Sequence, residues 1–258
     1  LLSSVLVAAA PEGVTLVADG KPRAAVIVAA GAEPKSAPIV GASVLCAHLA
    51  QMSGARLPVV REEDAGKAEV KDGVLSFKGG NVPADATAFV LLGESELTRK
   101  LGVTSEGLGS GGLCVKATAN AVALIGSATG ADTRGCRYAV IALLEELGFR
   151  FLWPAESGKV VPKSATVVVP ALDKRYTPPL LYRYIRWQPS IPRGFAKGLA
   201  ALGGTQEEWT KLRQEATRQT APISWTDWHG NNVDVVGSLG GHSGAGLGSE
   251  GREALKQH

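Results

Sequence analysis

Residues 134–154, RGCRYAVIALLEELGFRFLWP, join a helical pattern directly to an aromatic strand. Apolar side chains recur every three or four positions in the first half, as expected for a helix with one buried face: Cys136, Ala139, Val140, Leu143, Leu144 and Leu147. We expect Asp132 or Thr133 to cap the start of this helix and Gly148 to cap its end. A short strand over residues 149–152 should follow. A helix that returns at once to a strand is typical of a layered α/β domain.

The segments around this unit alternate in the same way. Short apolar runs predict strands at residues 14–17, 25–29, 57–60, 88–92, 113–117, 121–125 and 166–169. Helical spacing predicts one helix that ends at Gly54 and a brief one around Leu97 and Leu101. The polar stretch 61–85 should be a loop or a hairpin. We therefore predict an α/β layered domain with a mixed sheet that ends near Pro170.

Composition places the chain among ordinary globular proteins. It has 258 residues, of which 45% are hydrophobic and 20% charged, enough for one large domain or two smaller ones. The net charge is +3, but Lys and Arg are scattered among Asp and Glu, so nucleic acid is not an expected partner. No run beyond the N-terminus is apolar and long enough to span a bilayer.

The first ten residues, LLSSVLVAAA, are apolar and end in small side chains. This pattern indicates the end of a secretory signal peptide, and a first β-strand is the alternative. With the first interpretation, residues 1–13 are the remainder of a signal and the protein is secreted or periplasmic.

Three cysteines, Cys46, Cys114 and Cys136, cannot all pair within one chain, and no Cys/His cluster or HExxH pattern is present. We therefore expect no disulfide framework, no metal site and no cofactor. The turn LIGSATGADTRG, residues 124–135, is glycine-rich and opens a helix, but it matches neither GxGxxG nor GxxxxGK[ST]. A nucleotide-dependent enzyme is an alternative that rests on this turn alone.

Pro178-Pro179 marks a boundary, because consecutive prolines continue neither a helix nor a strand ladder. Beyond it, LLYRYIRWQPS predicts a new strand. Residues 205–219 should form a helix, with Thr205 and Glu208 in capping-box positions. The stretch 236–251 is glycine-dense and should be a loop.

Two side chains of the new strand are candidates for ligand contact. Arg186 could bind a carboxylate through two hydrogen bonds, and the ring of Trp187 could stack on a sugar. The alternative is an arginine paired with a neighbouring acid and a tryptophan packed under a loop. His242, in GGHSG, is a further candidate because a loop histidine could reach a substrate.

The order of motifs over residues 14–170 resembles the N-terminal domain of bacterial α-glucuronidases. That domain is itself similar to the one preceding the catalytic barrel in β-N-acetylhexosaminidases. The resemblance is carried by MSGARLPVV, FVLLGES, GLCVKATANAVALIG, RGCRYAVIALLEELGFRFLWP, VVP and PPLLYRYIRW, in this order. The helix ending MSGARLP fits the recurrent pattern hxGxxLP, and residues 135–154 fit GxxYAxxxLLExxGxRWxxP.

The remainder is similar to the opening of a barrel-type region in exported bacterial proteins of unknown function that carry the same N-terminal domain. Arg183 fits the "yR" of a first strand, and residues 240–243 fit a "GGHxF"-like loop. Gly244 stands where an aromatic side chain is usual. Residues 256–258 fit the start of an "HPEYF"-like run.

The resemblance implies an α/β (α+β) layered accessory domain with a mixed sheet over residues 14–172. It implies that residues 180–258 are the start of a (β/α)₈ barrel that the chain does not complete. The chain would then be a fragment of an exported glycoside-hydrolase-like protein that acts in carbohydrate degradation. The two catalytic carboxylates would lie beyond His258, and the chain alone would be inactive.

Active sites of such barrels lie at the C-terminal ends of the strands. Arg186, Trp187 and His242 would therefore approach a carbohydrate substrate. The alternative function is a non-catalytic carbohydrate-binding or structural module.

Overall fold

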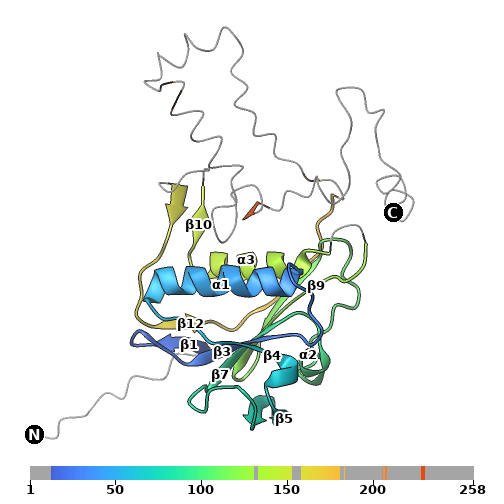
Figure 1. The fold of residues 1–258 in the computed structure, drawn as a ribbon. Helices are drawn as coiled ribbons and strands as arrows, with labels where there is room; N and C mark the ends of the chain where they lie inside the picture. Colours follow the sequence, from blue (N-terminus) through green and yellow to red (C-terminus); the bar gives the residue numbers. More distant parts are fainter. Residues whose placement is uncertain are drawn as a thin grey trace, which may run out of the picture.

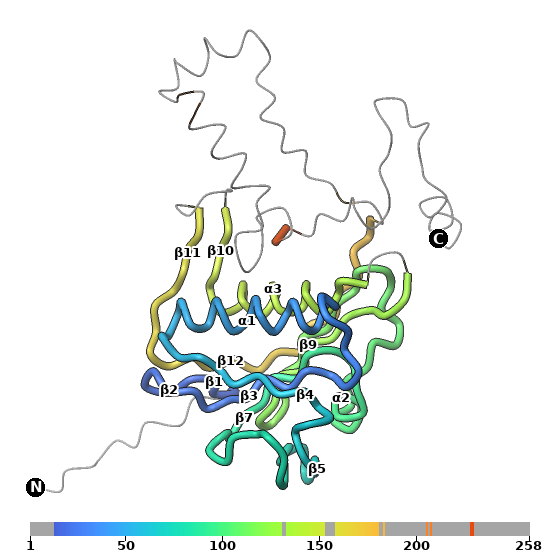
Figure 2. Tube along the Cα trace, viewed as in Figure 1, coloured from blue at the N-terminus to red at the C-terminus, as the bar shows by residue number. Residues whose placement is uncertain are grey.

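The computed structural model describes residues 13–130, 133–152 and 158–180, together with Arg183, Thr205, Glu207, Trp228 and His229. The continuous ranges form a mixed sheet with two helices on one face (Figure 1, Figure 2). The prediction of an α/β layered domain with a mixed sheet is confirmed. The predicted signal segment lies outside the described residues except for Gly13, and only a few residues of the predicted barrel region are described.

Six strands form the main sheet, in the order β13-β8-β9-β7-β3-β4. Their bounds are β3 Ala24–Val28, β4 Val59–Arg61, β7 Ala88–Leu92, β8 Leu113–Ala117, β9 Ala121–Gly126 and β13 Asp173–Tyr176. β4, β3, β7 and β9 run parallel, whereas β8 is antiparallel to β9 and β13 is antiparallel to β8. β3 and β7 are buried at every residue, which explains their continuous apolar sequences.

Helices α1 (Ala37–Ser53) and α3 (Gly135–Glu146) lie side by side on one face of this sheet (Figure 1). The strand side chains that pack with these helices form the larger core, among them Val26, Val90 and Leu124. Gly41 allows the helices to approach closely, because a Cβ at this position would lie 3.2 Å from Val140 Cγ2.

The helix ends agree only in part with the prediction. Gly54 adopts the left-handed conformation expected after α1, with φ of 78°. The N-cap of α3 is Arg134, not Asp132 or Thr133, and its side chain makes no capping hydrogen bond. The reason is steric. Gly135 packs against the backbone of Gly126, and this contact fixes where the first turn of α3 begins. The cap residue at the other end is Leu147, and the left-handed Gly148 follows it, with φ of 94°.

The opposite face of the sheet is covered by a hairpin and a short helix, α2 (Glu96–Lys100). The polar stretch 61–85 contains a 3₁₀ turn (Glu62–Asp64) and the hairpin of β5 (Lys67–Lys71) and β6 (Val74–Lys78). Asn120 ties this hairpin to the sheet, because its side-chain amide donates to Leu75 O and accepts from Leu75 N, both at 2.8 Å.

Two smaller sheets complete the described part. β1 (Val14–Ala18) pairs with β12 (Val167–Val169) and, through a turn with positive φ at Asp19 and Gly20, with β2 (Lys21–Pro22). β10 (Arg150–Phe151) and β11 (Lys159–Val160) form a ribbon that extends beyond the helices (Figure 2). None of the helices in the described ranges combines the length and hydropathy needed to cross a bilayer.

The three cysteines are free. Cys136 is fully buried beside β9, and its thiol donates to Leu124 O at 3.1 Å. Burial raises the pKa of the Cys136 thiol to about 12 and that of the Cys46 thiol to about 11. Both thiols are therefore protonated near neutral pH and act as small apolar side chains.

Replacing Leu144 by Asp tests the packing of α3. Leu144 is fully buried in the larger core, so an aspartate there would be a buried, unpaired charge. We expect the free energy of unfolding of Leu144→Asp to fall by several kcal/mol, measured by urea denaturation. Leu180→Asp is the matched control, since Leu180 is 65% exposed and its change should be small. Equal effects of the two substitutions would contradict the core position of Leu144.

Candidate functional site

The three site residues predicted from the sequence, Arg186, Trp187 and His242, lie outside the described residues. Two regions of the described structure carry groups that could bind a ligand. One is the edge of the main sheet where the parallel strands end, the usual ligand position in open α/β sheets. The other is a groove between α3 and the edge strand β13.

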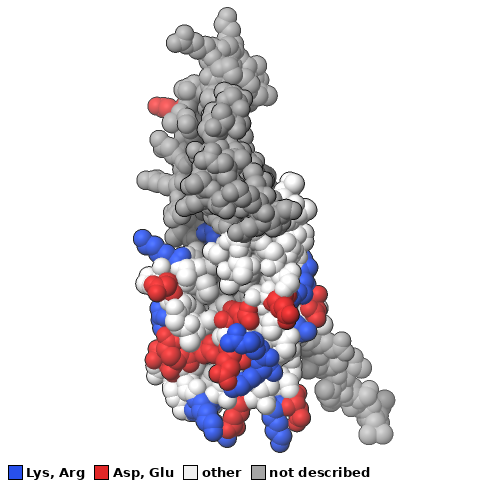
Figure 3. Space-filling view, turned by 90° about the vertical axis from the view of Figure 1, so that its right-hand side faces the viewer, with Lys and Arg blue, Asp and Glu red and all other residues white. Residues whose placement is uncertain are grey.

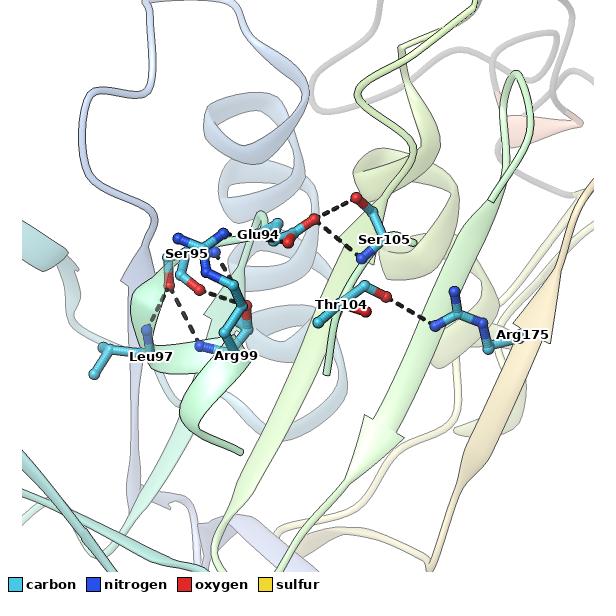
Figure 4. A network of polar contacts seen from close by, with 8 residues as sticks. Glu94, Ser95, Leu97, Arg99, Thr104, Ser105 and Arg175 are labelled. Atoms are coloured by element: carbon cyan, nitrogen blue, oxygen red, sulfur yellow. Dashed lines mark hydrogen bonds and ion pairs between the residues drawn. The ribbon is translucent and has the colours of Figure 1, made fainter. Parts of the chain in front are cut away.

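The sheet edge is occupied by a loop of the chain itself. Glu94 follows β7, and its carboxylate accepts hydrogen bonds from the backbone N–H of Ser105 at 3.0 Å and from the Ser105 hydroxyl (Figure 4). Its other oxygen pairs with the Arg99 guanidinium at 3.2 Å. From β13, Arg175 donates to the carbonyls of Thr104 and Glu106 in the same loop.

The hydrogen bonds to Glu94 also lower its pKa, and lysine partners lower the pKa values of two other glutamates. The hydrogen bond from the Ser105 hydroxyl is the main cause that lowers the pKa of Glu94. The pKa values of Glu69 and Glu96 are lowered by Lys78 and Lys100, respectively. A general acid in glycoside hydrolysis needs a raised pKa, so these three carboxylates are suited to pairing and not to proton donation.

The glycine-rich turn between β9 and α3 is also held by its own groups. The Ser127 hydroxyl donates to Leu108 O at 3.1 Å and accepts from the Thr129 backbone N–H at 3.1 Å. A Cβ at Gly126 would overlap the backbone nitrogen of Cys136, and one at Gly135 would overlap the Gly112 carbonyl. These contacts account for glycine at both positions without a phosphate ligand.

The groove lies along the flank of α3 that faces away from α1. Tyr138, Ile141, Ala142 and Glu145 share this flank because they are spaced by three, four and seven residues. The other walls are formed by β8, β13 and the segments that follow: Gly111, Leu113, Lys174, Tyr176, Pro178, Arg183, Trp228 and His229. The cavity volume is about 440 Å³, within the range of small-molecule sites.

Trp228 also lines the groove, 83 residues along the chain from Glu145. Only 5% of its surface is exposed, and its indole N–H donates to Glu145 Oε1 at 3.0 Å. Its ring packs against His48 of α1 and Phe151 of β10, with centroid distances of 5.4 and 6.3 Å. Elements from both helices and the β10–β11 ribbon therefore form one seat for this side chain.

The two histidines at this seat have different environments. His48 is buried, and its Nδ1 lies 2.7 Å from Val44 O, so Nδ1 carries a proton. Burial lowers the pKa of His48, and the ring is neutral near pH 7. His229 is exposed, and its Nε2 lies 2.8 Å from Phe151 O.

Arg183 and Arg134 both lie close to the Tyr138 ring. Each guanidinium carbon is 5.7 Å from the ring centroid. Arg183 also donates to Leu180 O at 2.9 Å. The Tyr138 ring is therefore held between the helix and two cations, which fixes its orientation at the groove wall.

Two residues of the groove, Tyr138 and Glu145, are not among the site residues predicted from the sequence. Glu145 accepts the indole N–H of Trp228, and its neighbour Glu146, outside the groove lining, pairs with Lys174 of β13 at 3.0 Å. Tyr138 was placed on no functional surface. Its spacing of seven residues from Glu145 was the available signal, because positions two helical turns apart lie on one flank.

Charge on the described surface is mixed. Figure 3 shows Lys and Arg side chains interspersed with Asp and Glu side chains on the face it presents. Within the described ranges, no group of three or more His, Cys, Asp or Glu side chains is placed to hold a metal ion.

Glu94→Gln tests the loop anchor. The lowered pKa means that the charged carboxylate stabilises the fold above the pKa of the unfolded state, and that this stability is lost as pH falls through the folded-state pKa. We expect Glu94→Gln to lose about 1–2 kcal/mol of unfolding free energy at pH 7. The gap to the wild type should shrink below about pH 4. Chemical denaturation across this pH range measures both, and a gap independent of pH would contradict the charged anchor.

A double-mutant cycle tests the seat of Trp228. Trp228→Phe removes the indole N–H, and Glu145→Ala removes its acceptor, so their effects on unfolding free energy should couple by about 1 kcal/mol. The control cycle pairs Trp228→Phe with Glu146→Ala, whose carboxylate contacts Lys174 instead. Those two effects should add. Additive effects in the first cycle would mean that the indole and Glu145 do not interact in solution.

No family model matches the sequence, and no curated protein matches it. Among solved structures, a family GH115 4-O-methyl-α-glucuronidase with specificity for decorated arabinogalactans is similar, with a TM-score of 0.42 and 16% sequence identity. The match covers 66% of this chain, and the chain spans 19% of that protein's length.

Proposed function

We propose that the chain is part of an exported carbohydrate-degrading protein of the glycoside-hydrolase type, in which residues 14–172 form a non-catalytic accessory domain. The catalytic carboxylates then lie in a barrel region beyond His258. One carboxylic acid protonates the leaving oxygen of the glycosidic bond, and the other carboxylate attacks the sugar carbon or activates water. Residues 14–172 support that region and do not carry out the reaction.

The observation that carries this proposal is the seat of Trp228. The segments that resemble α-glucuronidase N-terminal domains supply its walls: α1 contributes His48, α3 contributes Glu145, and β10 contributes Phe151. A residue of the second region is thus bound by the motif-bearing elements of the first. This arrangement is expected of an accessory domain that packs against the region after it.

The positions of the resembling motif support the same proposal, because each has a physical role in the unit. Gly135 permits contact between α3 and the sheet, and Leu143 and Leu144 fill the core. Tyr138 and Glu145 face the groove. The motif therefore describes a helix with one side in the core and a second flank that lines the groove and binds Trp228.

Activity of the complete gene product tests the proposal. The reading frame beyond residue 258 would be cloned, and the complete product and the 258-residue chain would be assayed on a panel of aryl glycosides and plant polysaccharides. We expect hydrolysis by the complete product only. Two acidic residues at strand ends of the barrel would be replaced by Asn or Gln, and each change should abolish turnover.

Two results would contradict the proposal. Turnover by the pure 258-residue chain would place catalysis within it. A complete product that binds polysaccharide without hydrolysing it would support the alternative, a non-catalytic carbohydrate-binding module.

A further inference from the structure

The groove along α3 has the components of a ligand site, and the accessory role proposed above assigns it no ligand. Its floor is apolar, formed by Ile141, Ala142 and Leu113. Gly111 also lines the groove. A ligand with a flat apolar face would fit such a floor.

An aromatic side chain borders this floor on the strand side. Tyr176 is the last residue of β13 and pairs in register with Leu113 of β8, which places it at the groove wall. Half of its surface is exposed, in contrast to Tyr138 and Trp228, which are 8% and 5% exposed. The ring of Tyr176 therefore has a surface available to a ligand, whereas the other two rings are mainly covered by protein.

The charged groups of the groove balance each other. Two cations, Lys174 and Arg183, and one carboxylate, Glu145, line the groove, and the carboxylate of Glu146, which lies outside the lining, pairs with Lys174. The Lys174 ammonium has three N–H donors, of which the ion pair with Glu146 uses one. Glu145 receives the Trp228 indole on Oε1, and its carboxylate has two oxygens. The site thus presents donors and acceptors without an excess of either charge, which favours a neutral ligand with hydroxyl groups over an anion.

We propose that the groove between α3 and β13 binds a short neutral saccharide, with Tyr176 stacking on a sugar ring and Lys174 and Glu145 bonding its hydroxyls. The C–H face of a pyranose is apolar and flat enough to pack on an aromatic ring, and its hydroxyls both donate and accept hydrogen bonds. The inference rests on the proposed function for its choice of ligand class. It adds a binding site in the described residues, separate from any catalytic centre.

Calorimetry on the 258-residue chain tests this inference with three probes, xylohexaose, cellohexaose and mannohexaose. At least one should bind. Tyr176→Ala should weaken binding of that probe about tenfold, since loss of an aromatic contact is worth about one factor of ten in affinity. Tyr176→Phe keeps the ring and should bind as the wild type does. The exposure of Tyr176 makes both variants compatible with folding, which their melting midpoints will verify.

A lysine pair supplies the matched control for the polar contacts. Lys174 and Lys78 are both strand lysines paired with a glutamate, at 3.0 and 2.9 Å, but only Lys174 lines the groove. Lys174→Ala should weaken binding severalfold, and Lys78→Ala should leave it unchanged.

Three results would overturn the inference: binding of none of the probes, equal binding by Tyr176→Ala and the wild type, or equal losses from Lys174→Ala and Lys78→Ala. The hydrolase proposal fails separately. If the complete product hydrolyses glycosides but Tyr176→Ala binds the probe as the wild type does, the saccharide site in the groove is contradicted and the hydrolase proposal stands. If probe binding depends on Tyr176 but the complete product hydrolyses nothing, the hydrolase proposal is contradicted and the saccharide site in the groove stands.

Discussion

The backbone contact between the end of β9 and the start of α3 determines how the rest of the unit is arranged. Gly126 and Gly135 meet where neither position has room for a Cβ. Helix α3 therefore starts directly on the sheet, and its buried side chains reach β8 and β9. Helix α1 then fits beside it through Gly41. Both faces of α3 depend on this contact: the face in the core and the flank that lines the groove.

Local patterns in the sequence were sufficient to predict most of this architecture. The buried parallel strands are continuous apolar runs, and Ala88–Leu92 is one that is buried at every position. The hairpin of β8 and β9 lies where two apolar runs flank Asn120. The stripe of α3 from Cys136 to Leu144 is buried as its spacing predicted. Each of these features is encoded within one element, which is why the residues alone reveal it.

Features that depend on distant partners were not predictable in this way. β13 reads DKRY, is exposed at all four residues and has no apolar alternation, so only its pairing with β8 defines it as a strand. The start of α3 is set by glycine packing and not by a capping side chain. The seat of Trp228 joins residues 83 positions apart, and no local period reports such a contact.

The motif of residues 135–154 therefore serves two physical purposes at once. Its leucines and glycines stabilise the fold, while Tyr138 and Glu145 line the groove and Glu145 accepts the indole N–H of Trp228. Arg150 completes the motif, because its guanidinium donates at 2.6 Å to the Glu145 carbonyl at the end of α3 and so fixes the backbone of the residue that receives Trp228. Tyr138 packs in the core and also lines the groove, and Glu145 lines the groove on the same flank. Because Tyr138 and Glu145 lie on one flank, two turns apart, α3 contacts the groove and Trp228 as well as the sheet.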